Sequence, residues 1–196
     1  MSGPAVTHLL YLHGFRSSPK STKARIVAAW LARERPDIVW HCPQLPPSPA
    51  DALRGILAHC ERWPHETMGV VGSSLGGFYA TVVAETLACR AVLLNPAVNP
   101  ARDLAGHVGE IGAWHSDERF DFRAEFVDEL RRLTPGTLDD PGRYLAIIAK
   151  GDELLDWREM AARYAGCHVK LLEGSDHALS DFEHHLHDLL DFLGLR

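Results

Sequence analysis

The sequence predicts an α/β fold of about six mainly parallel strands with helices on both faces. Six short apolar runs, rich in β-forming residues, alternate along the chain with helix-like stretches, which is typical of a parallel sheet with right-handed crossovers. Most of these runs are continuously apolar, as expected for strands that helices cover on both faces. The predicted strands span residues 7–12, 37–41, 67–71, 91–94, 144–149 and 168–172.

Start signals accompany the helices predicted between these strands. Ser18 and Ser48 each precede a proline, an arrangement that favours a helix N-cap followed by the first helical position. Residues 78–88 form a helix-like run, and apolar residues recur at helical spacing from Phe122 to Leu133. Ser180 opens a capping-box pattern, which predicts that the last helix begins there.

The composition is that of one globular domain spanning residues 1–196. Apolar residues make up 46% and charged residues 23% of the chain, which is enough for a sizeable core. The net charge of −6, without a Lys/Arg cluster, argues against a nucleic-acid partner. No apolar run approaches the ~18 residues of a membrane span, and the N-terminus lacks a secretory pattern, so we expect a cytoplasmic protein without a membrane partner. The oligomeric state is left open.

Four cysteines are scattered along the chain, as Cys42, Cys60, Cys89 and Cys167. They form no Cys-x-x-Cys pair and match neither the spacing of a zinc site nor that of a disulfide framework. We therefore expect reduced thiols, most of them buried, and no metal site.

The connection between the fourth and fifth predicted strands is longer than a simple crossover requires. Residues 97–120 within it carry little strand or helix character. Ligands of parallel α/β sheets bind beyond the carboxyl ends of the strands, so this segment is either a lid or substrate wall, or a packed surface excursion. Its aromatic residues, Trp114 and Phe120, and the nearby Phe122 are candidates either for an acyl pocket or for the core.

Gly72-Ser73-Ser74-Leu75-Gly76 gives the strongest functional signal. It lies directly after an apolar strand-like run and directly before a helix-like run. A Gly-x-Ser-x-Gly segment in that position is typical of a nucleophile elbow, a tight turn that presents the central serine at the end of a strand. The turn leaves little room for side chains on either side, which explains the glycines. The pattern predicts Ser74 as a nucleophile.

A serine nucleophile needs a base within hydrogen-bond reach and a third group that orients the base. His177 follows the last predicted strand and is the candidate base. Two aspartates, Asp152 and Asp156, follow the strand before it. Asp156, with Glu159 three residues later, also fits a helix N-cap, so Asp152 is the favoured acid and Asp156 the alternative.

The loop after the first strand completes the predicted site. An oxyanion hole needs two backbone N–H donors, and we expect them from Leu75, directly after the serine, and from Phe15 in this loop. His13 precedes the serine in the chain and is expected to shape the loop rather than to act as the base. Arg16 and Lys20 either meet an anionic substrate such as acyl-CoA or are solvated loop charges.

Five blocks that follow one another over nearly the whole chain resemble a known group of proteins. They are residues 9–19, 72–80, 94–98, 150–158 and 174–177. In these blocks the chain resembles the YqiA/YcfP-type bacterial esterases, small members of the α/β-hydrolase superfamily. The resemblance implies a compact α/β-hydrolase fold, esterase activity on carboxylic esters or thioesters, and no cofactor. It places Ser74, Asp152 and His177 on the triad positions, whereas Ser175 departs from a glycine that is common before the Asp-His pair.

These residues together predict a serine hydrolase that acts through an acyl-enzyme. Ser74 attacks the carbonyl group of a small-molecule acyl ester or thioester, His177 accepts its proton, and Asp152 orients His177. An amidase or peptidase with the same triad is one alternative. A non-catalytic binding protein on a hydrolase fold is another, since a fold does not determine a function. The acyl chain length and the leaving group are not predicted.

Overall fold

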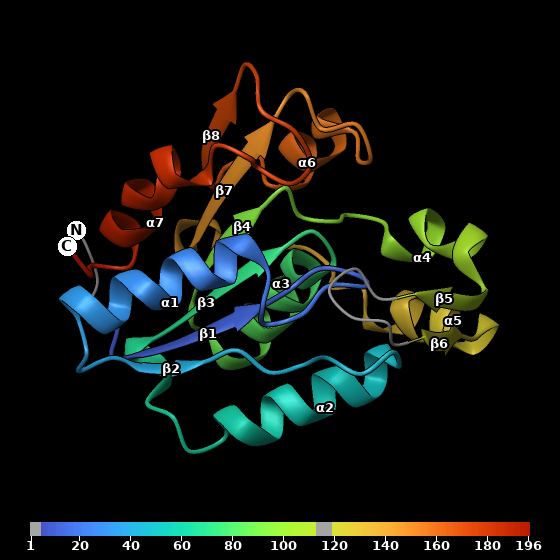
Figure 1. Cartoon of the computed structure of the whole chain (residues 1–196), viewed down its shortest axis with the longest axis horizontal. Coiled ribbons are helices and arrows are strands. Elements are labelled where there is room, and N and C mark those ends of the chain that lie inside the picture. The colour runs from blue at the N-terminus through green and yellow to red at the C-terminus, as the bar shows by residue number, and fades with distance from the viewer. Residues whose placement is uncertain (1–4, 113–118) are drawn as a thin grey trace.

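A parallel sheet of six strands forms the centre of the computed structural model, which describes residues 5–112 and 119–196 (Figure 1). The strands follow the order β2-β1-β3-β4-β7-β8, and every neighbouring pair is parallel. They are β1 (His8–Leu12), β2 (Val39–His41), β3 (Met68–Ser73), β4 (Arg90–Leu94), β7 (Tyr144–Ala149) and β8 (His168–Leu172). The prediction of six mainly parallel strands is confirmed, because each strand overlaps one of the predicted runs.

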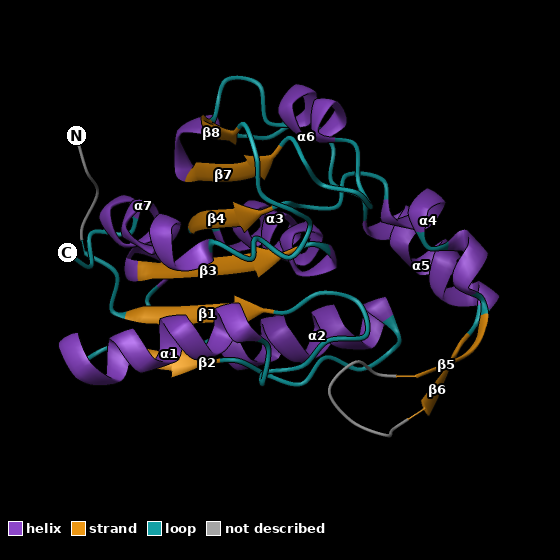
Figure 2. Ribbon diagram, turned by 45° about the horizontal axis from the view of Figure 1, so that its top comes forward, coloured by secondary structure: helices purple, strands orange, loops and turns teal. Residues whose placement is uncertain are grey.

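Helices cover both faces of this sheet (Figure 2). On one face, Val27 and Leu189 of two helices are fully buried in a cluster with Leu9 of β1. The helices on this face are α1 (Thr22–Glu34) and α7 (Leu186–Phe192). The helices on the opposite face are α2 (Pro49–Cys60), α3 (Leu75–Leu87) and α6 (Trp157–Arg163). Within the described residues, no helix is long and apolar enough to cross a membrane.

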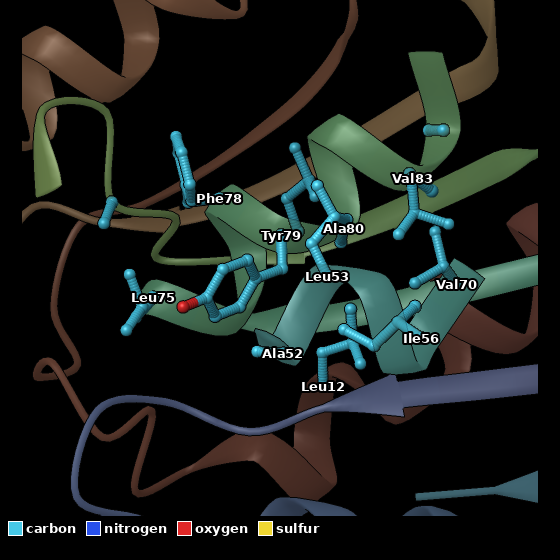
Figure 3. Packing of buried hydrophobic residues seen from close by; sticks show 14 of the residues in the cluster. Leu12, Ala52, Leu53, Ile56, Val70, Leu75, Phe78, Tyr79, Ala80 and Val83 are labelled. Atoms are coloured by element: carbon cyan, nitrogen blue, oxygen red, sulfur yellow. The ribbon is translucent and has the colours of Figure 1, made fainter. Parts of the chain in front are cut away.

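α3 is buried on almost every side, as expected for a helix that is apolar all round. Figure 3 shows Val83 of α3 in a cluster with Leu53 and Ile56 of α2 and Val70 of β3. Because packing surrounds the helix, the position of its first residue, Leu75, is fixed relative to the sheet. Short 3₁₀ helices elsewhere in the chain span His65–Thr67, Ala105–His107, Pro141–Arg143 and Phe182–His185.

The segment between β4 and β7 contains more regular structure than the sequence predicts. Its elements are α4 (Pro100–Asp103), the antiparallel strands β5 (Gly109–Gly112) and β6 (Arg119–Phe122), and α5 (Ala124–Leu133). The expectation of little strand or helix character in residues 97–120 is therefore wrong, and Phe122 ends β6 instead of opening the following helix. Strands of four residues are too short to show an alternating pattern in the sequence. Each of these two strands forms because it pairs with the other, more than because of its local β-propensity.

Of the three helix starts predicted from serines, one is confirmed. The Ser48 hydroxyl accepts a hydrogen bond from the backbone three residues later and caps α2. Ser18 is followed by a turn instead, and α1 begins four residues later. Ser180 donates its hydroxyl to Asp176 at 2.6 Å, and the chain passes through a 3₁₀ turn before α7 begins. Such local side-chain hydrogen bonds compete with helix capping, which explains the wrong prediction at Ser180.

Candidate active site

Ser74 lies at the sharp turn between β3 and α3, as the Gly-x-Ser-x-Gly pattern predicts. Its backbone has a φ of 56° and a ψ of −120°, a conformation that costs a non-glycine residue ~1–3 kcal/mol. The flanking glycines make the turn possible. A Cβ at Gly72 would lie 2.2 Å from the carbonyl oxygen of Gly76, and a Cβ at Gly76 would lie 2.0 Å from that of Leu12. Strand, turn and helix therefore pack closer than side chains at these positions permit.

Backbone hydrogen bonds tie the strained turn to its surroundings. The N–H of Ser74 donates to the carbonyl of Leu94 at the end of β4, at 3.0 Å. The carbonyl of Ser74 accepts from the N–H of Ala97 at 3.0 Å and from that of Gly77 at 2.8 Å. These bonds to β4, to the loop after it and to α3 hold the serine in its strained conformation.

Ser74, His177 and Asp152 form a continuous chain of polar contacts. The Ser74 Oγ lies 3.0 Å from Nε2 of His177, and Nδ1 of the same ring lies 2.8 Å from Oδ2 of Asp152. An ionised carboxylate only accepts hydrogen bonds, so Nδ1 carries the proton and Nε2 is left to accept the serine hydroxyl. The side chain of Asp152 is fully buried and that of His177 is 12% exposed. The three residues follow β3, β8 and β7, whose carboxyl ends lie at one edge of the sheet.

The two aspartates after β7 have different partners. Oδ1 of Asp152 accepts from the backbone N–H groups of Leu154 at 2.9 Å and Leu155 at 2.8 Å, while Oδ2 faces His177. Asp156 is the N-cap of α6 and accepts from the N–H of Arg158 at 2.9 Å. The structure therefore brings Asp152 to the histidine and gives Asp156 the capping position that its spacing predicts.

The loop after β1 presents backbone donors beside the serine. Phe15 lines the same cavity as Ser74, and Leu75 is the first residue of α3. Within the described residues, neither amide N–H has an acceptor in the protein. His13 is buried and bridges the loop, because its Nε2 accepts from the N–H of Leu45 at 3.1 Å and its Nδ1 lies 3.0 Å from the carbonyl oxygen of the next residue. Both predicted oxyanion-hole amides are thus free to donate to a ligand.

The loop of residues 13–17 lines two cavities. The larger has a volume of about 660 Å³, and Ser74 and His177 form part of its wall. The smaller has a volume of about 450 Å³ and includes Leu75 and Tyr79 in its lining. Cavities of these sizes fit small organic molecules, and Phe15 lines both of them.

The segment between β4 and α5 contributes to both cavities. Asp103, Leu104 and His107 line the larger cavity, and Arg119 and Phe120 line the smaller one. Residues of this segment thus border both cavities, and its role as a lid or substrate wall stays a prediction.

The other residues that the sequence singled out lie in different places. Phe120 lines the smaller cavity, Phe122 is buried in the core beneath Phe15, and Trp114 lies outside the described residues. Arg16 lines both cavities, and its Nε donates to the carbonyl of Gly112 in β5 at 2.6 Å. Lys20 is exposed and lines neither cavity, as expected of a solvated charge.

Asn95 is a residue of the site that reasoning from the sequence did not assign to any role. It is fully buried at the end of β4, with a φ of 43°. Its Nδ2 donates to the backbone carbonyls of Asp176 at 3.0 Å and His177 at 3.2 Å, and its Oδ1 accepts from the N–H of Ala149 at 2.8 Å. One carboxamide thus joins the end of β7, which precedes Asp152, to the loop that carries the histidine.

We expect Asn95→Gly to lower kcat by about 100-fold while KM changes less than about threefold. Glycine tolerates the positive φ, so the substitution removes only the carboxamide that fixes the histidine loop. A displacement of ~1 Å in a reacting group costs ~10² in rate. Steady-state kinetics would measure the split, with a melting curve to verify folding. A rise in KM at an unchanged kcat would contradict this role.

The parallel sheet with helices on both faces, and the turn that carries Ser74, identify the α/β-hydrolase fold. Solved structures of other proteins share this fold. One of the metagenome-derived lipolytic enzymes LipS and LipT matches with a TM-score of 0.70 and 20% identity, over 100% of this chain and 97% of that one. Est1E from Butyrivibrio proteoclasticus matches with a TM-score of 0.71 and 16% identity, over 97% and 88%. The Pyrococcus furiosus esterase Pf2001 matches with a TM-score of 0.63 and 17% identity, over 97% and 81%. At these identities the likeness establishes the fold.

The chain belongs to the uncharacterised protein family UPF0227, whose family model matches residues 8–194. The match covers nearly all of the sequence, including Ser74, Asp152 and His177. It confirms the resemblance to the YqiA/YcfP-type proteins of the α/β-hydrolase superfamily.

Proposed function

We propose that this protein is a serine esterase that hydrolyses carboxylic esters or thioesters through an acyl-enzyme. The observation that carries the proposal is the contact chain from Ser74 Oγ to His177 Nε2 at 3.0 Å and from His177 Nδ1 to Asp152 Oδ2 at 2.8 Å. The serine end of this chain opens onto the cavity of about 660 Å³, and the aspartate end is buried. A hydroxyl activated in this way, beside a cavity, is suited to acyl transfer.

In the proposed mechanism, the ring of His177 carries its proton on Nδ1 and accepts the hydroxyl proton of Ser74 at Nε2. The serine oxygen forms a bond to the carbonyl carbon of the ester, and the tetrahedral intermediate collapses as His177 returns the proton to the leaving alcohol or thiol. A water molecule then gives a proton to His177 as it attacks the carbonyl carbon of the acyl-enzyme. The second tetrahedral intermediate collapses as His177 returns that proton to Ser74 Oγ, which releases the acid and restores the serine hydroxyl. Asp152 stabilises the imidazolium that forms in both steps.

The negative charge on the carbonyl oxygen of the intermediate needs donors that are already in place. We assign this role to the backbone N–H groups of Phe15 and Leu75, neither of which has a protein acceptor within the described residues. Leu75 also begins α3, and the partial positive charge at a helix N-terminus favours a developing anion. Each donor of this kind contributes ~3 kcal/mol in the transition state.

The known structural neighbours support ester chemistry on this fold. LipS and LipT are lipolytic enzymes, Pf2001 is an esterase, and Est1E has been solved with ferulic acid bound. The fold does not by itself fix the bond that is cleaved, so the choice of esters over amides rests on the site and on the family resemblance together.

The test is hydrolysis of p-nitrophenyl esters from acetyl to palmitoyl, with acyl-CoA thioesters as a second series. Protein inactivated with a fluorophosphonate, a reagent that labels activated serines, serves as the blank. We expect one label per chain, on Ser74, and a rate that depends on chain length. Cleavage of matched anilides at equal or higher rates would favour an amidase, and a well-folded protein that takes up no label would favour a binding protein.

A further inference from the structure

Both cavities are bordered by Gly14, which lies directly against the nucleophile. A Cβ at Gly14 would come within 3.3 Å of the Cβ of Ser74 and 3.8 Å of its Oγ. Leu75, the next residue after the serine, lines only the smaller cavity, whereas Ser74 and His177 line only the larger one. An ester bound with its carbonyl carbon at Ser74 therefore lies next to both cavities.

The reaction gives each part of such an ester a direction. The carbonyl carbon carries three groups: the oxygen, the leaving group and the acyl chain. In the proposed mechanism the oxygen faces the amides of Phe15 and Leu75, and the leaving oxygen or sulfur must lie within hydrogen-bond reach of His177 Nε2, which protonates it. The leaving group therefore belongs in the cavity that His177 lines, and the acyl chain extends away from the histidine.

The lining of the smaller cavity suits a hydrocarbon chain. Of the residues that line this cavity alone, two carry an amide or a charge, Gln44 and Arg119, and both are bonded within the protein. The Gln44 amide donates to the carbonyl of Ser17 at 3.3 Å, and Nε of Arg119 lies 2.8 Å from the carboxylate of Glu110. The others are apolar or aromatic: Leu45, Pro46, Pro47, Leu75, Tyr79 and Phe120.

Leu75 and Tyr79 give this apolar lining a fixed position relative to the serine. They lie four residues apart in the first turns of α3 and so share one face of the helix (Figure 3). Both are buried in the core cluster on that side of the sheet. The wall of the smaller cavity is thus built on the same rigid helix that begins directly after Ser74.

The larger cavity is a poorer place for a hydrocarbon chain. Charged side chains of both signs border it and not the smaller cavity, namely Lys23, Asp103 and Glu153. An alkyl chain along these groups would take water from them without replacing its hydrogen bonds, which is unfavourable. At about 660 Å³ against about 450 Å³, this cavity also accepts the bulkier part of a substrate.

We propose that the smaller cavity holds the acyl chain of the substrate and the larger cavity holds the alcohol or thiol that leaves. The inference rests on the proposed esterase function and names its substrate class, esters or thioesters of an apolar acyl chain with a larger leaving group. The volume of about 450 Å³ limits the acyl chain, so the rate on p-nitrophenyl esters should peak at an intermediate chain length.

Leu45 and Leu104 form a matched pair for the test, because both are half-buried and each lines only one cavity, the smaller and the larger respectively. Leu45→Trp should lower the ratio of kcat/KM for p-nitrophenyl octanoate over the acetate by about tenfold or more, the cost of a group that an apolar pocket no longer accepts. Its ratio for 2-naphthyl acetate over phenyl acetate, which differ only in the leaving group, should not change. Leu104→Trp should lower the second ratio and leave the first unchanged.

Two further variants separate filling of a cavity from damage to the fold. Leu45→Ala enlarges the smaller cavity and should move the optimum to longer acyl chains, the opposite shift to that of Leu45→Trp, which misfolding cannot produce. Leu171→Trp places the same substitution on β8, where the leucine is 40% exposed and lines neither cavity. It should leave both ratios at their wild-type values.

The assignment is overturned if Leu45→Trp changes the leaving-group ratio instead of the acyl ratio, if it changes neither, or if Leu104→Trp lowers the acyl ratio. In each of these cases the acetates are still cleaved at Ser74, so the esterase function stands without this division of the cavities. A wild-type protein that cleaves none of the four esters would overturn the esterase function itself, and the assignment with it.

Discussion

Ser74→Ala is expected to lower kcat on the best p-nitrophenyl ester by about 10⁶-fold, the loss typical when a triad nucleophile is removed. The proposed mechanism has no other group that can form the acyl-enzyme, since Ser74 Oγ is the atom within 3.0 Å of the His177 ring. Alanine should keep the fold, because the backbone of the turn is held by hydrogen bonds to Leu94, Ala97 and Gly77. The measurement is the rate above the uncatalysed background, with a melting curve for each protein.

Ser74→Gly separates the chemistry of this position from its backbone strain. Both variants lack the hydroxyl, but only glycine adopts a φ of 56° without a steric penalty. We therefore expect Ser74→Gly to be equally inactive and to melt higher than Ser74→Ala, by several degrees for the ~1–3 kcal/mol of strain relieved. A residual rate well above background in either variant would show that another nucleophile acts. Equal melting temperatures would show that the turn stores no strain.

The sheet was predictable because its strands are buried on both sides and read as continuous apolar runs. The hairpin of Gly109–Gly112 and Arg119–Phe122 was not, because two strands of four residues carry no periodic signal and depend on each other for pairing. Phe122 illustrates the difficulty. It lies at helical spacing from Phe126, and yet it ends a strand and is buried against Phe15.

That Ser74, Asp152 and His177 lie close together was predictable for a different reason. In a parallel sheet the carboxyl ends of the strands meet at one edge, so Ser74, Asp152 and His177 could be brought together from their order along the chain alone. Asn95 and Lys23 could not be identified in this way. The role of Asn95 arises from two loops that reach its carboxamide in the folded chain, and Lys23 is distinguished from Lys20 only by the cavity that it faces.

Asp152→Asn is expected to lower kcat by about 10⁴-fold. The carboxamide oxygen can still accept from the backbone N–H groups of Leu154 and Leu155, so the loop should keep its conformation. The amide nitrogen would then face Nδ1 of His177, and a donor there favours the tautomer with its proton on Nε2. In that tautomer the ring cannot accept the proton of Ser74, and the imidazolium loses its carboxylate partner.

Asp156→Asn is the matched control, four residues away and chemically the same substitution. Asparagine is as good an N-cap as aspartate, so α6 should be unaffected and kcat should stay within about twofold of the wild type. A large loss in this variant and a small one in Asp152→Asn would reassign the acid to Asp156. Combining Asp152→Asn with Ser74→Ala gives the sharper test. If the residues act as a unit, the second substitution should cost almost nothing once the serine is gone, whereas additive losses would mean that Asp152 acts independently of the serine.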